Sequence, residues 1–200
     1  LLGTQMVAKG LDFENVTLVG VLDADLSLYV QNYHAAERTY SLLAQVVGRA
    51  GRGERAGRAV IQTYHPENEV IQAAAKQDYE AFYQNELRLR RLRRYPPFAD
   101  LFTLTVSGRE EMRVIAAACA LRDALRAASE REPLRALETE VLGPAGAPVV
   151  KVNERYRYCV YLSGRSDNAL RRTVSEYLLA FSARKENRGL DIFADCNALQ

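Results

Sequence analysis

The chain has 200 residues, 48% of them apolar and 26% charged, and its formal net charge at pH 7 is +2. This length and composition can form one large globular domain or two small ones with buried cores. The near-neutral charge identifies no partner, and no run of about eighteen apolar residues predicts a membrane span. Because the chain opens with Leu-Leu-Gly-Thr, without an initiator methionine or a leader pattern, we expect it to be cut from a longer protein.

The cysteines Cys119, Cys159 and Cys196 are far apart and never form a C-x-x-C pair. Only His34 and His65 could add imidazole ligands, so the sequence predicts no metal site within this chain. Isolated cysteines are typical of a reducing compartment, where they act as small apolar residues. We therefore expect a cytoplasmic protein.

The first part of the chain has the element order of an α/β sheet. One strand is expected to end near Thr4, and the apolar run at 16–24 predicts a parallel strand covered on both faces. A helix is predicted at 34–50 and a further strand at 58–63. The apolar positions of this helix include Ala36, Tyr40, Leu43 and Val47. Strand, helix and strand in this order indicate one half of an α/β sheet.

Helical patterning returns from about 66 to 94 and stops before Pro96-Pro97, because proline cannot continue a helix. The elements predicted beyond it are strands at 101–107, near 138–142, at 155–162 and at 190–194, with helices at 109–130 and 166–184. This β-α-β-β-α-β order is typical of an α+β sandwich whose helices cover one face of a mostly antiparallel sheet. We therefore predict three parts: 1–65, a helical connector at 66–96 and a C-terminal domain at 97–200.

Each helix of the C-terminal domain is predicted to bury one apolar stripe. For the helix at 109–130 the stripe is Met112, Ile115, Ala116 and Cys119. For the helix at 166–184 it is Leu170, Val174, Tyr177, Leu178 and Phe181.

The strongest chemical signal is the segment Gln45-Val46-Val47-Gly48-Arg49-Ala50-Gly51-Arg52. Two arginines three apart at a helix end share a face, and glycines let a bound group approach the backbone. The planar guanidinium pairs with phosphate oxygens through two hydrogen bonds. The same pattern, taken alone, also fits a solvated basic loop after a helix, so both interpretations stay open for this segment.

A second segment, from Gly3-Thr4-Gln5 to Gly10-Leu11-Asp12-Phe13, precedes the buried strand. Together the two segments resemble motifs V and VI of superfamily 2 helicases. Other stretches extend the resemblance over nearly the whole chain, to the PriA family of replication-restart helicases (primosomal protein N′). They are Ala36-Glu37-Arg38, Ile61-Gln62-Thr63, Asp78-Tyr79 with Phe82, Glu86-Leu87 and Arg90, Pro96-Pro97-Phe98, Val141-Leu142-Gly143-Pro144 and Arg155-Tyr156-Arg157-Tyr158.

The resemblance implies that residues 1–65 are the C-terminal half of a RecA-like helicase lobe 2. In motif V it places Thr4 on DNA and Gly10 and Asp12 beside ATP. The full-length protein would bind ATP and Mg²⁺, and the zinc-binding cysteines of the family would lie upstream. Because this chain has no G-x-x-x-x-G-K-[ST] loop and no acidic magnesium motif, we expect it not to hydrolyse ATP alone.

In motif VI the resemblance brings Gln45, Gly48, Arg49 and Arg52 to ATP. Arg49 and Arg52 would be the catalytic arginines. Arg52 is the candidate arginine finger, which stabilises the charge that develops on the transferred phosphoryl group.

The resemblance also makes the C-terminal domain a binding site for branched or single-stranded DNA and for the single-stranded-DNA-binding protein SSB. Lys151, Arg155, Tyr156 and Arg157 are the candidate DNA contacts, because strand alternation places the arginines on one face and the tyrosines on the other. A hairpin with its tyrosines in the core and its arginines in water fits the same pattern. For the acidic SSB tail, Arg171 and Arg172 are candidates.

The arginine run from Arg88 to Arg94 leaves two interpretations open. Cations are favoured near a helix C-terminus, and they could equally contact a DNA backbone. For the whole protein, the resemblance predicts an ATP-dependent 3′-to-5′ DNA helicase that recognises stalled forks and restarts replication with other primosome proteins. The alternatives are a non-catalytic DNA- or SSB-binding module and another superfamily 2 translocase, such as a fork-reversal helicase.

Overall fold

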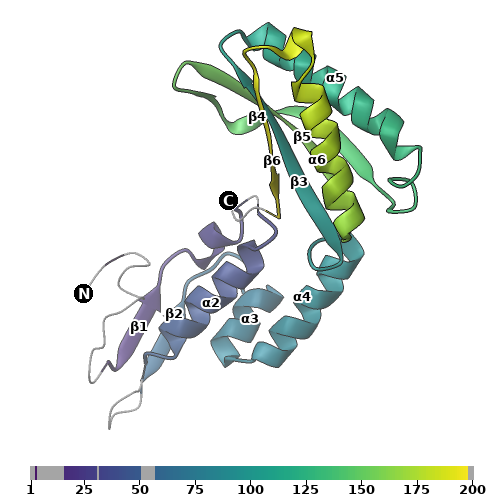
Figure 1. The fold of residues 1–200 in the computed structure, drawn as a ribbon. Helices are drawn as coiled ribbons and strands as arrows, with labels where there is room; N and C mark the ends of the chain where they lie inside the picture. The colour runs from purple at the N-terminus through teal and green to yellow at the C-terminus, as the bar shows by residue number, and fades with distance from the viewer. Residues whose placement is uncertain (1–2, 4–15, 31, 51–56, 198–200) are drawn as a thin grey trace. The chain divides into compact units, whose positions relative to one another are not determined.

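The computed structural model describes residue 3 and residues 16–30, 32–50 and 57–197 (Figure 1). The chain divides into two compact units, one that ends at Leu89 and one that begins at Arg90. This division lies inside a helix, a few residues before the Pro96-Pro97 sequence where the boundary was predicted. Each unit has its own hydrophobic core. The division into three parts stays a prediction.

The first unit is an α/β arrangement. Its elements are β1 (Leu18–Val21), the 3₁₀ helix η1 (Ala24–Ser27), α2 (Ala35–Val47), β2 (Arg58–Ile61), α3 (Glu69–Lys76) and most of α4 (Tyr79–Arg93). β1 and β2 pair in parallel, with Leu18 opposite Arg58 and Val21 opposite Ile61. The predicted order of strand, helix and strand is therefore confirmed.

The core of the first unit lies between α2, α3 and α4. Leu43 and Ala74 are fully buried, and the ring of Tyr40 stacks on that of Phe82 with their centroids 4.3 Å apart. Tyr40 and Leu43 belong to the stripe predicted for α2, so that prediction is confirmed at both positions. Leu43 and Ala44 pack in or against this core, so the core positions the last turns of α2, where the arginine motif begins.

One face of the two-stranded sheet is open among the described residues. Val21 and Ile61 pack against the core, whereas Leu18 and Val60, on the opposite face, are 64% and 46% exposed. Parallel strands in proteins are normally covered on both faces. The first unit therefore lacks a covering layer on this side within the part of the chain that the structure describes.

The helical stretch predicted at 66–94 forms two helices. α3 begins at Asn68, whose side chain accepts hydrogen bonds from two backbone N–H groups. It ends at Gln77, which has the left-handed φ of 54°. The carboxylate of Asp78 then accepts a hydrogen bond from the first turn of α4. α4 ends before Arg94, which is also left-handed and lies two residues ahead of Pro96.

The second unit is the predicted α+β sandwich. Its elements are β3 (Ala99–Gly108), α5 (Glu111–Ser129), β4 (Glu140–Val152), β5 (Arg155–Arg165), α6 (Asn168–Ser182), the 3₁₀ helix η2 (Lys185–Asn187) and β6 (Asp191–Cys196). The strand order is β4-β5-β3-β6, and every neighbouring pair is antiparallel. Helices α5 and α6 cover one face of this sheet (Figure 1).

The core of the second unit corrects one predicted helix stripe. In α6, Leu170, Val174, Leu178 and Phe181 are buried as predicted, and only Tyr177 is exposed. In α5, Met112 is 77% exposed, and the predicted stripe through Ala116 is wrong. The buried face consists of Val114, Ala117, Ala118, Leu121, Leu125 and Ala128. Both the predicted and the observed stripe have helical spacing, but the observed stripe continues to Leu121 and Leu125 in the second half of the helix.

β4 is longer than the strand predicted near 138–142 because it continues through irregular pairing. Its register with β5 shifts twice between Leu142 and Lys151. Gly143 has a φ of +105°, and a Cβ there would lie 2.9 Å from the carbonyl oxygen of Cys159. A glycine followed by Pro144 normally ends a strand, which is why the sequence prediction stopped there.

Candidate functional site

The described part of the arginine motif lies at the end of α2. Gln45 is exposed in the last turn, and Gly48 closes the helix with its N–H donated to the carbonyl of Ala44. A Cβ on Gly48 would lie 2.9 Å from Nε2 of Gln77, so the end of α3 packs closely against this turn. Arg49 follows, half-buried, with its Nε atom shielded from solvent.

The structure describes three of the predicted nucleotide-binding residues: Gln45, Gly48 and Arg49. Thr4, Gly10, Asp12 and Arg52 lie outside the described residues. The roles of all seven stay predictions.

Arg155 begins β5 and is held by the neighbouring strands of the sheet. Its guanidinium donates to the hydroxyl of Ser107 at 3.3 Å and to the carbonyl oxygen of Ser107 at 3.1 Å. It also forms an ion pair with Asp191 at 2.6 Å. Ser107 lies opposite Asp191 in the register, so these three side chains share the sheet face that α5 and α6 leave open.

The predicted alternation along β5 is confirmed. Tyr156 and Tyr158 pack against the core on the helix side, while Arg155 lies on the other face. The hydroxyl of Tyr158 donates to Glu111 at 2.8 Å, and this hydrogen bond raises the pKa of Tyr158. The interpretation that places the tyrosines in the core therefore describes both of them. A DNA contact by Tyr156 stays a prediction.

In the β4–β5 hairpin, Lys151 lies opposite Tyr156 on the neighbouring strand, and Arg157 follows Tyr156 along β5. Nζ of Lys151 lies 5.2 Å from the centroid of the Tyr156 ring and 3.1 Å from a carboxylate oxygen of Glu154. The hydrogen bond with Glu154 raises the pKa of Lys151. The side chain of Arg157 is half-buried and forms no hydrogen bond or ion pair with any residue that the structure describes.

Two arginines that the sequence analysis did not single out lie beside Arg155. Arg109 and Arg113 line a hollow of about 260 Å³ together with Arg155, Glu110, Gly189 and Leu190. Arg113 donates to the carbonyl oxygens of Glu186 at 3.0 Å and Arg188 at 2.6 Å. Arg109 and Arg113 are more than 40 residues from Arg155 in the sequence, and no sequence pattern links them to it. The antiparallel pairing of β3 with β5 and β6 brings them together.

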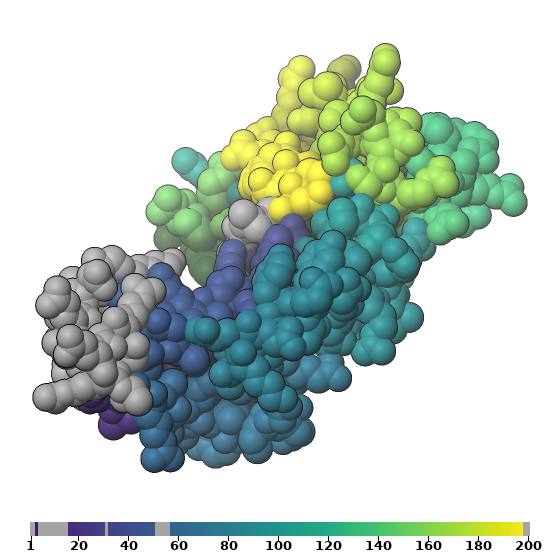
Figure 2. Space-filling model, turned by 90° about the horizontal axis from the view of Figure 1, so that it is seen from below, coloured from purple at the N-terminus to yellow at the C-terminus, as the bar shows by residue number. Residues whose placement is uncertain are grey.

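The arginine run of α4 makes mainly structural contacts. Arg90 is buried and donates to the carbonyl oxygen of Pro96 at 2.9 Å, and the guanidinium of Arg91 lies 4.9 Å from the centroid of the Phe98 ring. Arg94 donates to the carbonyl oxygen of Glu138 at 2.9 Å. These contacts favour the structural interpretation of the run. Much of the remaining surface of α4, teal in Figure 2, is exposed.

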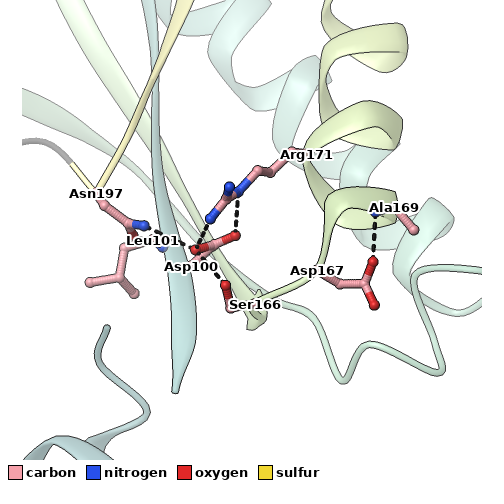
Figure 3. Close-up of polar contacts among 7 residues, drawn as sticks. All are labelled: Asp100, Leu101, Ser166, Asp167, Ala169, Arg171 and Asn197. Carbon is pink, nitrogen blue, oxygen red and sulfur yellow. Dashed lines mark hydrogen bonds and ion pairs between the residues drawn. The ribbon is translucent and has the colours of Figure 1, made fainter. Parts of the chain in front are cut away.

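Arg171, one of the two candidates for an acidic partner, binds a buried carboxylate of its own unit (Figure 3). It donates to both oxygens of Asp100, which also accepts hydrogen bonds from Ser166 at 3.0 Å and Asn197 at 2.9 Å. Arg172 is exposed and pairs with Glu176 on the same helix at 2.9 Å. Arg171 thus has a structural role, and the acidic-partner role of both arginines stays a prediction.

No three His, Cys, Asp or Glu side chains of the described residues form a metal-binding group. Within the same residues, none of the helices is both long and apolar enough to cross a membrane.

The fold and these contacts define an α/β unit in which helix α2 ends at an arginine motif, followed by an α+β sandwich with arginines gathered at one end of its sheet. The family model described as the primosomal protein N C-terminal domain matches residues 91–197, which are nearly the whole of the second unit. The chain belongs to this family.

Curated relatives extend the similarity into the first unit. The chain is 40% identical over 197 residues, or 98% of its length, to the replication restart protein PriA of Bacillus subtilis. It is 42% identical over 79% of its length to the PriA of Synechocystis and 37% identical over 92% to that of Treponema pallidum. The matched regions cover 24%, 18% and 27% of these relatives, so the chain corresponds to about a quarter of such a protein.

Proposed function

We propose that the chain is the C-terminal portion of an ATP-dependent 3′-to-5′ DNA helicase. The complete protein would recognise stalled or branched replication forks in the cytoplasm and restart replication by assembling a primosome. One observation carries the proposal: similarity to replication restart proteins covers 98% of the chain and therefore both of its units. The resemblance of the arginine segment to motif VI points to the same class of motor.

The first unit is proposed to be part of a RecA-like helicase lobe. Its parallel β1 and β2, with α2 between them in the chain, support this assignment. The open face at Leu18 and Val60 is where the rest of the lobe would pack, since the chain spans only about a quarter of its relatives. A PriA-like protein of full length would supply that layer from upstream residues.

The described residues at the end of α2 supply part of a proposed binding site for a nucleotide phosphate. Gln45 is exposed there, and the half-buried Arg49 lies in the turn that begins at the glycine closing the helix. Bound Mg-ATP would supply the phosphoryl group, and Arg49 with Arg52 would stabilise the negative charge that develops on it. The residues that hold magnesium and zinc would lie in the upstream part of the full-length protein.

The second unit is proposed to bind branched or single-stranded DNA and SSB. Arg155 and Arg157 lie on one face of β5, so these two cations can reach successive phosphates. Lys151 pairs with Tyr156 across the hairpin and would contact DNA from the other face. For SSB and the other primosome proteins, the support is that the relatives are replication restart proteins, together with the resemblance of the sequence.

Unwinding by the full-length gene product tests the proposal. We expect ATP-dependent separation of a forked duplex that offers a 3′ single-stranded tail, and no ATP hydrolysis by the 200-residue chain alone. A full-length protein that binds forks but never hydrolyses ATP would instead be a non-catalytic binding module, and the helicase assignment would be wrong.

A further inference from the structure

We propose that the hollow between Arg109, Arg113 and Arg155, the arginine pocket, seats one phosphate group of a DNA backbone. The inference rests on the proposed DNA-binding role of the second unit and names a contact site within it. The pocket combines the end of β3, the start of α5, the start of β5 and the turn before β6. The three arginines of the lining therefore come from two separate stretches of the chain, the β3–α5 junction and the start of β5.

Two of the three arginines are fixed before any ligand arrives. Arg155 is held by the hydroxyl and carbonyl of Ser107 and by Asp191. Arg113 is held by two backbone carbonyl oxygens in the turn that follows α6. Because these side chains are already ordered, binding an anion costs little additional conformational entropy. Guanidinium groups also keep unused N–H donors after such contacts, since each has five.

Arg109 is the arginine that can respond to a ligand. It is exposed and forms no hydrogen bond or ion pair with any other residue in the described part of the chain. The backbone beside it is open as well, because a Cβ placed on Gly189 would meet nothing within 4 Å. A phosphate can therefore approach the peptide at Gly189 while Arg109 closes over it.

The charge of the pocket fits a phosphodiester. Three arginines contribute +3, and Glu110 in the lining and Asp191 on Arg155 contribute −2, which leaves +1. One phosphodiester carries a single negative charge and offers two unesterified oxygens to guanidinium donors. The hollow of about 260 Å³ is far larger than one water needs, so it admits a phosphate with its adjoining sugar atoms.

The arginine pocket also adds Arg109 and Arg113 to the cationic residues that the sequence predicts as DNA contacts. Arg157 lies two residues from Arg155 on the same face of β5, and Ser107 is its cross-strand neighbour. A strand that runs from Arg157 across Arg155 would enter the pocket at this end of the sheet. Arg109 and Arg113 would then be DNA contacts in addition to Lys151, Arg155 and Arg157.

Fluorescence anisotropy with a labelled single strand and a labelled fork, over a salt series, tests this inference on the 200-residue chain. We expect Arg109→Ala to weaken binding several-fold and to reduce the slope of log K against log salt by about 0.7 to 0.9, the value of one phosphate contact. Arg109→Lys should keep most of that slope, because it keeps the charge. A wild-type-like thermal unfolding curve for Arg109→Ala would show that the variant folds.

The matched control is Arg131→Ala. Arg131 is also exposed, and it follows the far end of α5, a helix of 19 residues and therefore about 28 Å long. Removing it takes away the same charge without touching the pocket, so its salt slope should equal that of the wild type. If Arg109→Ala and Arg131→Ala behave alike while the wild type binds DNA, the pocket inference is wrong.

Absence of any wild-type binding at low salt would have a different meaning. It would overturn the DNA-binding role of the second unit itself. A poly-glutamate peptide serves as a second probe: if the wild type binds it through Arg109 but does not bind DNA, the ligand is an acidic peptide and the phosphate assignment fails.

Discussion

Arg171 donates two hydrogen bonds to the carboxylate of Asp100, from Nε to Oδ2 at 2.8 Å and from an NH2 group to Oδ1 at 3.1 Å. Asp100 is buried at the start of β3, whereas Arg171 reaches it from the first turns of α6. Ser166 and Asn197 donate to the same carboxylate, so four segments of the second unit meet at one charged group. Burial raises the pKa of Asp100, but these hydrogen bonds outweigh it and the net pKa is lowered.

Asp100→Asn should lower the free energy of unfolding of the second unit by about 2 to 4 kcal/mol, because it removes the charge that three donors share. Urea unfolding monitored by far-ultraviolet circular dichroism measures the loss. Asp167→Asn is the matched control, since Asp167 caps α6 through one hydrogen bond to the N–H of Ala169 and asparagine caps helices equally well. Equal losses in the two variants would contradict the central role of Asp100.

Stability should also depend on pH in the acid range. Asp100 and Asp25 both have a pKa below the ordinary 3.8. At Asp25, burial raises the pKa, but hydrogen bonds from Tyr64 and Thr63 outweigh burial and lower it. A lowered pKa in the folded state means that the stabilisation is complete above the unfolded pKa and is lost as the pH falls through the folded values. We expect a plateau near neutral pH and a decline below about pH 4.

Unfolding midpoints in urea between pH 2 and pH 7 would show this decline. Asp100→Asn should flatten the decline for the second unit, because the substituted side chain no longer titrates. A variant with the same acid dependence as the wild type would mean that other carboxylates govern the transition.

Gly143→Ala should destabilise the second unit by about 1 to 3 kcal/mol. The φ of +105° at Gly143 strains any side chain, and the new Cβ would meet the carbonyl oxygen of Cys159. Gly146→Ala is the comparison, since a Cβ there meets only the side chain of Val150, at 3.0 Å. Thermal unfolding of both variants should rank Gly143→Ala as clearly the less stable.

The buried face of α5 can be tested with two substitutions of similar size. Leu121→Ala should cost about 2 to 5 kcal/mol of unfolding free energy, because Leu121 is fully buried. Met112→Ala should change it by less than about 0.5 kcal/mol, because that side chain lies in solvent. A larger effect at Met112 would restore the stripe predicted from the sequence.

Arg52→Ala in the full-length protein should reduce DNA-stimulated ATP hydrolysis by roughly a thousandfold or more, as expected for an arginine finger. Its affinity for forked DNA should stay close to that of the wild type. Steady-state hydrolysis and anisotropy on the same preparation measure the two quantities. Turnover that survives within a factor of about ten would remove Arg52 from the catalytic role.

Most of the fold could be predicted because the apolar periods of helix and strand are local properties of the sequence. The order β3-α5-β4-β5-α6-β6 and the parallel pairing of β1 with β2 followed from them. The buried side of α5 was missed because the predicted stripe stopped at Cys119, whereas the buried stripe continues to Leu121 and Leu125. The break at Gln77 was missed because a left-handed residue that ends a helix is usually glycine, and glutamine gives no such signal in the sequence.

The candidate site was predictable to a smaller extent. Alternation along β5 correctly separated Arg155 from Tyr156, because a strand has a fixed period of two. Arg109 and Arg113 were missed, since their relation to Arg155 depends on which strands pair. The buried carboxylate of Asp100 was missed for the same reason: its donors come from α6, from the residue after β6 and from Ser166.

The pairing of β3 has a consequence for biosynthesis. Among the described residues, β6 pairs with β3 alone. Helices α5 and α6 and strands β4 and β5 separate the two strands in the sequence. During translation, one edge of β3 would stay unpaired until β6 has been made. Asp100 would lack its hydrogen bond from Asn197 during the same interval. Unpaired strands are templates for wrong partners. Premature termination before β6 would therefore yield a product prone to aggregation and suited to recognition by chaperones or proteases.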